Sequence, residues 1–178
     1  SYVTSLQKLI ESNSGLSDGT LSLKEKFSQQ ISGFLFDVIS LHRDDEAILE
    51  NSMPQLFQAA ILDNFDNFVE VIDKIEELSL SKVSLFVKDM LNSLSQSEND
   101  TKSNILKING IRCVGDRLEN CSISSAKCIF ERIFICKDEW LLIKAKKLCN
   151  DLQNFIFVTE RGTVCQTSNE MSFGTPSD

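Results

Sequence analysis

"CVGDRLENCSISSAKCIFERIFIC" (Cys113–Cys136) holds four of the six cysteines of the chain, and Cys149 and Cys165 follow it. Residues 1–112 contain none, and the gaps between successive cysteines are 7, 6, 7, 12 and 15 residues. An even number of cysteines without the two-residue gap of a zinc knuckle or redox pair favours three disulfides in an oxidising compartment. The alternatives are a zinc site built from thiolates alone and a reduced protein with six buried thiols.

The disulfide candidates are Cys113, Cys121, Cys128, Cys136, Cys149 and Cys165. Six cysteines allow 15 pairings, so the sequence leaves the connectivity open. If the helices expected on either side of "ENCS" pack antiparallel, Cys113 lies across from Cys128.

Two glycosylation sequons agree with secretion: "NDT" at Asn99 and "NCS" at Asn120. Asn99 lies in the polar stretch 95–103, where we expect a loop. The chain begins at Ser1 without Met or signal peptide, which fits a mature chain after signal removal and equally a shortened one. We therefore expect an extracellular, secreted protein.

The rest of the chain predicts helices. It has only two prolines and seven glycines in 178 residues, and its apolar residues recur at spacings of three and four. Ser52 with Gln55, and Asp138, are expected N-terminal caps. The expected helices span residues 3–11, 21–41, 46–51, 52–75, 79–96, 104–118, 124–137 and 139–158.

These patterns predict an all-α fold, a compact bundle of about eight helices with a disulfide-stapled C-terminal half. Residues 1–98 would form an acidic lobe without cysteines, and residues 99–178 a cysteine-rich lobe, unless both belong to one continuous domain. No repeat of fixed period is found.

The net charge of −8 is unevenly distributed. Residues 1–100 carry 17 acidic and 7 basic side chains, whereas residues 101–178 carry 9 and 11. An acidic surface repels phosphate groups, so we expect neither nucleic-acid binding nor attraction to anionic membranes. No apolar run is long enough to span a membrane.

Catalytic motifs are absent from the sequence. His42 is the only imidazole, and "SLHRDDE" around it matches no hydrolase motif, so we expect a surface residue at a helix C-terminus and no enzyme. We expect no cofactor and no metal, because the acidic residues between Asp63 and Glu77 lack the turn and glycine of a calcium loop. They are expected to form a solvated helix face.

The one basic cluster is Lys144, Lys146 and Lys147 in "KAKK". It could contact an acidic partner or a glycosaminoglycan, or simply form a solvated helix face. The twelve Phe residues suit a hydrophobic core. Alternatively, some of them line a cavity for a lipid or another apolar ligand.

The layout "IRCVGDRLENC…AKCIFERIFICKDEW…KLCND…VC" after an acidic first half resembles the small secreted helical salivary proteins of blood-feeding insects, among them the neutrophil-stimulating factors of mosquitoes. This resemblance implies a non-enzymatic immunomodulatory effector that binds a host or partner protein. Our alternative expectation is a carrier of an apolar ligand.

Overall fold

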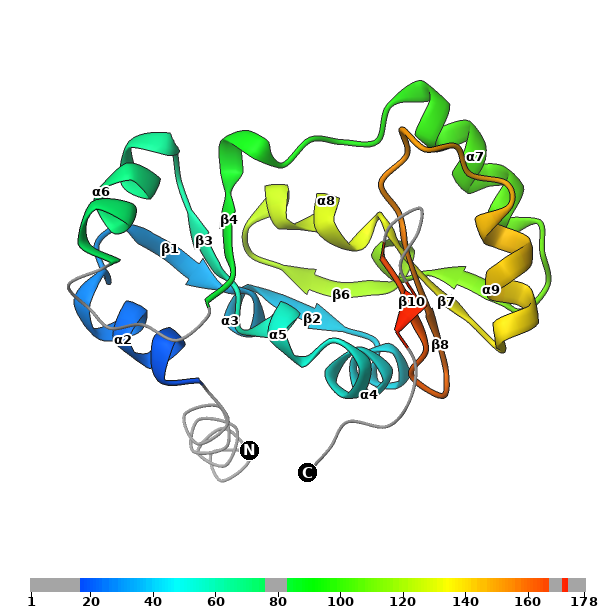
Figure 1. Cartoon of the computed structure of the whole chain (residues 1–178), viewed down its shortest axis with the longest axis horizontal. Coiled ribbons are helices and arrows are strands. Elements are labelled where there is room, and N and C mark those ends of the chain that lie inside the picture. The colour runs from blue at the N-terminus through cyan, green and yellow to red at the C-terminus, as the bar shows by residue number, and fades with distance from the viewer. Residues whose placement is uncertain (1–16, 76–82, 167–170, 173–178) are drawn as a thin grey trace. The chain divides into compact units, whose positions relative to one another are not determined.

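The computed structural model describes residues 17–75, 83–166 and 171–172 (Figure 1). Helices alternate along this part of the chain with strands of two to four residues, which form three sheets. The fold is therefore mixed α/β, and the predicted all-α bundle of about eight helices is wrong. Most of the strands are so short that they were absorbed into the expected helical patterns.

The chain forms two compact units. Unit 1 consists of Ser1–Phe36 and Gln55–Met90, and unit 2 of Asp37–Pro54 and Leu91–Asp178. The chain leaves unit 1 within the short helix α3 (Leu35–Val38) and re-enters it at the beginning of α5 (Pro54–Phe57).

Unit 1 contains a three-stranded sheet in the order β1-β3-β4. Strand β1 is antiparallel to β3, and β3 is parallel to β4. Helix α6 lies between β3 and β4 in the chain and supplies the crossover that two parallel strands need. The described elements of this unit are α2 (Asp18–Lys26), β1 (Ile31–Phe34), β3 (Ala60–Leu62), α6 (Phe65–Ile75), β4 (Leu85–Val87) and the 3₁₀ turn η2 (Lys88–Met90).

The core of unit 1 combines side chains from α2 and from the βαβ element. Leu23 and Phe27 pack with Leu62 of β3, Val71 of α6 and Val87 of β4. All three residues of β3 are buried. A central strand buried on both faces reads as a continuous apolar run, which explains why residues 60–62 could be mistaken for part of a helix.

Unit 2 contains a five-stranded sheet in the order β10-β9-β8-β7-β5 and a separate antiparallel pair, β2-β6. Strand β5 is antiparallel to β7, and β7 is parallel to β8 through helix α9. The elements of this unit are β2 (Ile39–Leu41), α4 (Arg43–Ser52), α7 (Gln96–Leu106), β5 (Ile111–Cys113), η3 (Val114–Arg117), β6 (Leu118–Cys121), η4 (Ser124–Ala126), α8 (Lys127–Phe130), β7 (Ile133–Cys136), α9 (Glu139–Lys146), β8 (Ile156–Thr159), β9 (Val164–Cys165) and β10 (Met171–Ser172).

The two units share one topology. In each, a first strand is antiparallel to a middle strand, and the middle strand is parallel to a third strand that follows a surface helix. The middle strand, helix and third strand are β3-α6-β4 in unit 1 and β7-α9-β8 in unit 2. The chain therefore has a repeated topology without the fixed sequence period that repeat detection requires.

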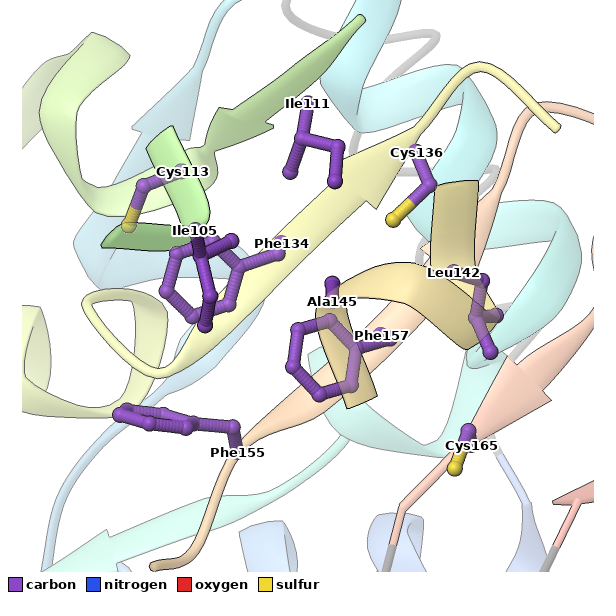
Figure 2. Close-up of a cluster of buried hydrophobic side chains, with 10 residues drawn as sticks. All are labelled: Ile105, Ile111, Cys113, Phe134, Cys136, Leu142, Ala145, Phe155, Phe157 and Cys165. Atoms are coloured by element: carbon purple, nitrogen blue, oxygen red, sulfur yellow. The ribbon is translucent and has the colours of Figure 1, made fainter. Parts of the chain in front are cut away.

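The core of unit 2 is built around aromatic rings on its sheet (Figure 2). Phe134 of β7 stacks on Phe157 of β8 with ring centroids 5.5 Å apart, and Phe155 meets Phe134 edge-on at 5.4 Å. Leu142 and Ala145 of α9 cover this cluster. These phenylalanines fill the core by contacting one another, which is the packing that aromatic rings favour.

Of the helix caps predicted from the sequence, one is confirmed and one is wrong. Asp138 caps α9, because its side chain accepts a hydrogen bond from the Leu141 amide, as predicted. Ser52 instead ends α4, and its hydroxyl donates to the Ile48 carbonyl. The stretch 95–103, predicted as a loop, begins helix α7 through a capping box between Ser95 and Glu98. The predicted helix 3–11 lies outside the described residues.

Candidate interaction surfaces

The cysteines do not form the predicted disulfides. All six, Cys113, Cys121, Cys128, Cys136, Cys149 and Cys165, are free thiols. Cys113 lies on β5 and its thiol donates to the carbonyls of Phe130 and Glu131, whereas Cys128 lies on α8, so the antiparallel helices that would have paired them do not exist.

The buried thiols are held in their protonated form. Burial raises the pKa of Cys136 to about 12 and that of Cys149 to about 11, and burial also raises the pKa of Cys113 and Cys165. A thiolate is the reactive form, so these four side chains act as small apolar residues and not as nucleophiles.

His42 lies at the N-terminus of α4, not at a helix C-terminus as predicted. Its Nδ1 accepts a hydrogen bond from the Asp44 amide at 3.3 Å. Nδ1 of His42 is therefore engaged in capping helix α4. Among the described residues, no group of three or more His, Cys, Asp or Glu side chains could hold a metal ion.

The most buried charge in unit 2 is Asp45 of α4. Its Oδ1 accepts from Arg112 Nε at 2.8 Å and lies 3.7 Å from Arg117 Nη1, while Oδ2 has no hydrogen-bond partner among the described residues. Arg112 also lies 3.8 Å from Glu160. This network joins α4 to β5 and η3, and sequence patterns could not reveal it because Asp45 and Arg112 are far apart in the chain.

Two hollows border this network. One has a volume of about 410 Å³ and is lined by Asp44, Ala47, Ile48, Arg112, Arg117 and Glu160. The other, of about 270 Å³, is lined by Gly110, Ile111, Arg112, Lys137 and Glu160. Arg112 and Glu160 line both hollows, and Arg112 Nη1 lies 3.8 Å from Glu160 Oε1.

A second polar cluster fastens α9 to the turn between β8 and β9. Glu139 accepts hydrogen bonds from the Thr159 and Thr163 hydroxyls and pairs with Arg161 at 2.7 Å. The Arg161 hydrogen bond is the main reason that the pKa of Glu139 falls to about 2, with a backbone hydrogen bond and Thr163 adding to it. These contacts order the surface beside α9.

The predicted basic cluster lies on α9 and just after it. Lys144 and Lys147 are exposed, whereas Lys146 is half-buried. Trp140, one turn before Lys144, is exposed over 81% of its surface. In the sequence, the only further indication of this surface is the single Trp close to the lysines.

The two sequon asparagines lie on regular elements. Asn99 is on helix α7 and Asn120 is on strand β6, opposite Ser40, and both are exposed. Asn99 therefore does not lie in the loop that was expected for it.

The sheet edges differ in how open they are to further pairing. The register of β1 is irregular between Ile31 and Gly33, and β5 carries Arg112 at its centre. Bulges and charges of this kind block edge-to-edge association. Strand β4 has neither, since its residues are Leu85, Phe86 and Val87 in regular register with β3.

None of the helices in the described part of the chain combines the length and apolarity needed to cross a bilayer. No family model matches the sequence. No curated protein matches it either.

Solved structures do match the fold. The SMC hinge domain of Geobacillus stearothermophilus, crystallised as an asymmetric dimer, has a TM-score of 0.72 and 15% identity over 98% of this chain and 70% of its own. The Pyrococcus furiosus Smc hinge domain with an extended coiled coil has a TM-score of 0.64 and 13% identity, over 98% of this chain and 63% of that one. The folded elbow of cohesin gives 0.63 and 14%, over 89% and 22%.

These matches overturn the predicted salivary effector. That expectation rested on an all-helical, disulfide-stapled chain, whereas the described residues are mixed α/β with free thiols and resemble SMC hinge domains. The secreted localisation, the glycoprotein and immunomodulatory roles, and the alternative of an apolar-ligand carrier are wrong with it. At 13–15% identity the likeness concerns the fold alone, which resembles that of SMC hinge domains.

Proposed function

We propose that this chain is a non-enzymatic, hinge-type association domain that pairs with a second protein chain of the same fold, in the first instance another copy of itself. The observation that carries this proposal is the fold match over 98% of the chain to a hinge domain that crystallised as a dimer. The host or partner protein expected from the sequence is, in this proposal, a second domain of the same fold.

Strand β4 supports the proposal because it offers a place for a second chain to pair. Leu85 and Phe86 are half-buried, and β4 has a neighbouring strand on one side only within the described residues. A strand edge of this kind exposes backbone N–H and C=O groups that another strand can satisfy. Its apolar side chains would add buried area to those hydrogen bonds.

The absence of enzymatic activity remains part of the proposal. It is supported by His42, whose Nδ1 caps a helix, and by Cys113 and Cys136, whose raised pKa values keep them protonated at neutral pH. The carboxylates of Asp45 and Glu139 are both engaged with arginines. In this proposal, these groups hold the fold and take no part in catalysis.

The test is the molar mass in solution, measured by light scattering after size exclusion over a range of protein concentrations. The chain has a mass of 20.0 kDa, so a dimer gives about twice that value. Leu85→Lys places a charge on β4 and should weaken the association relative to wild type. Ser32→Lys, on the irregular edge strand β1, is the matched control and should remain dimeric.

Circular dichroism melts of both variants show whether each one folds. A wild-type protein that stays monomeric at every concentration contradicts the proposal of self-association. A folded Leu85→Lys variant that associates as strongly as the wild type contradicts the assignment of β4 as the pairing edge.

A further inference from the structure

Helices α6 and α9 occupy the same position in the repeated topology, each between the middle strand and the third strand of its unit. Each buries one face against its own sheet. Val71 and Phe68 form the inner face of α6, and Leu142 and Ala145 form that of α9. The outward faces of both helices carry exposed apolar residues, but the two faces differ in the sign of their charge.

The outer face of α6 is apolar and acidic. Phe65, Val69 and Ile72 are exposed, Val69 over 53% of its surface, although all three are large apolar residues. Their spacings of four and three place them on one stripe of the helix. Asp66 and Asp73 are exposed beside this stripe.

The outer face of α9 is apolar and basic. Trp140 and Ile143 are exposed, and Lys144 and Lys147 follow Trp140 at spacings of four and seven, which puts them on the same side of the helix. Leu148, directly after the helix, is also exposed. Tryptophan is the residue most enriched among energetic hot spots at protein interfaces.

The charges on both faces are uncommitted within the described residues. Neither Asp66 nor Asp73 on α6 forms an ion pair there, and neither Lys144 nor Lys147 on α9 does. Other surface carboxylates, such as Asp63 with Lys88 and Asp116 with Lys102, are paired inside their own unit.

We propose that the outer face of α6 in one copy of the chain docks against the outer face of α9 in a second copy. Exposed apolar rows of this kind mark interaction sites. Charge complementarity selects the arrangement, because α6 against α6 would oppose carboxylates and α9 against α9 would oppose ammonium groups. Contact of α6 with α9 buries Trp140 and brings each acidic side chain toward a basic one.

This contact involves helix faces and not a sheet edge, so it goes beyond the strand pairing proposed above. The two are separable by mutation, since Leu85→Lys leaves both helix faces intact. The sole Trp of the chain, Trp140, reports directly on the helix contact through its fluorescence.

The experiment uses two charge-reversal variants of the full chain. Variant one is Lys144→Glu with Lys147→Glu, and variant two is Asp66→Lys with Asp73→Lys. All four substituted side chains are exposed, so both variants should fold, and circular dichroism melts verify this. The matched control reverses two exposed lysines of unit 2 that lie outside α9, Lys107→Glu with Lys127→Glu.

Sedimentation velocity and Trp140 fluorescence are measured for each protein over a concentration series. Wild type and control should show a blue shift of Trp140 emission as they associate, and added salt should weaken it. Each variant alone should associate on the order of tenfold more weakly, because its two faces now carry the same charge.

Mixing the two variants is the decisive measurement. In the mixture, every α6 face meets an α9 face of opposite charge, so association and the Trp140 shift should return to within about threefold of wild type. The proposal is overturned if Trp140 emission does not depend on concentration in wild type. It is equally overturned if folded variants associate like the control, or if mixing them restores nothing.

Discussion

Arg112 Nε lies 2.8 Å from Oδ1 of Asp45, a carboxylate with no exposed surface. The pair connects helix α4 to strand β5, and its two residues are 67 positions apart in the chain. An unpaired buried charge costs several kcal/mol, whereas a paired one is tolerated. The position of α4 in unit 2 therefore depends on this contact.

Asp45→Ala should lower the free energy of unfolding by about 2–4 kcal/mol, because Arg112 and Arg117 lose their shared carboxylate. Urea denaturation followed by circular dichroism measures the change. Asp44→Ala, at the exposed neighbouring position, should cost about 0.5 kcal/mol or less. Equal effects of the two substitutions would show that the buried pair does not contribute to stability.

Gly115→Ala should destabilise the protein by about 1–3 kcal/mol through steric overlap. A Cβ atom at Gly115 would lie 2.7 Å from the backbone nitrogen of Glu131 and 2.8 Å from its Cα. Backbone cannot move aside as a flexible side chain can, so η3, which contains Gly115, and the residue that follows α8 would have to separate locally. Thermal melts compare this variant with Glu119→Ala, an exposed position on β6, which should melt like the wild type.

When the protein is unfolded without prior reduction, iodoacetamide should alkylate all six cysteines, because no disulfide joins any of them. In the folded protein at pH 8, Cys136 and Cys149 should react far more slowly than in the unfolded chain, since their pKa values are raised to about 12 and 11. Mass spectrometry of peptides locates the labels. An intact mass six hydrogens lower than the reduced chain would restore the disulfide interpretation.

Glu139→Gln should change the pH dependence of stability in acid. The pKa of Glu139 is lowered to about 2 from 4.5 in the folded protein. Its carboxylate therefore stabilises the fold above pH 4.5, and this contribution is lost as the pH falls from 4.5 toward 2. The stability difference between wild type and variant should be largest at neutral pH and should shrink over that interval.

The control for this acid titration is Glu119→Gln, whose side chain is exposed and forms no ion pair among the described residues. Its stability curve should run parallel to that of the wild type. If the Glu139→Gln curve also runs parallel down to pH 2, the hydrogen bonds from Arg161 and Thr163 do not hold the carboxylate ionised.

Local signals in the sequence predicted some ends and faces of elements. The Asp138 cap of α9 is confirmed, and residues 65–75 of the Phe-rich stripe do form helix α6. The signals failed where a polar stretch was interpreted as a loop. Ser95 and Glu98 form a capping box in a stretch predicted as a loop, a pattern that polar composition concealed.

The functional interpretation failed for a different reason. An even cysteine count predicts disulfides only if pairs of cysteines come close with suitable geometry, and no sequence states those distances. Cys113 and Cys136 sit in the apolar core, where a thiol packs as a small hydrophobic group. Once the disulfides were assumed, secretion and the salivary resemblance followed from them.

The sequence by itself determined the uneven charge, the amphipathic character of α6 and the caps that begin helices, because each depends on neighbours within a few residues. Only the tertiary structure decided that Ile39 pairs with Cys121, that β3 is parallel to β4 and β7 to β8, and that Asp45 meets Arg112. Strands of three or four residues are too short to show a period of their own. They exist because backbone groups from distant segments satisfy one another in a sheet, and those partners are not visible along the chain.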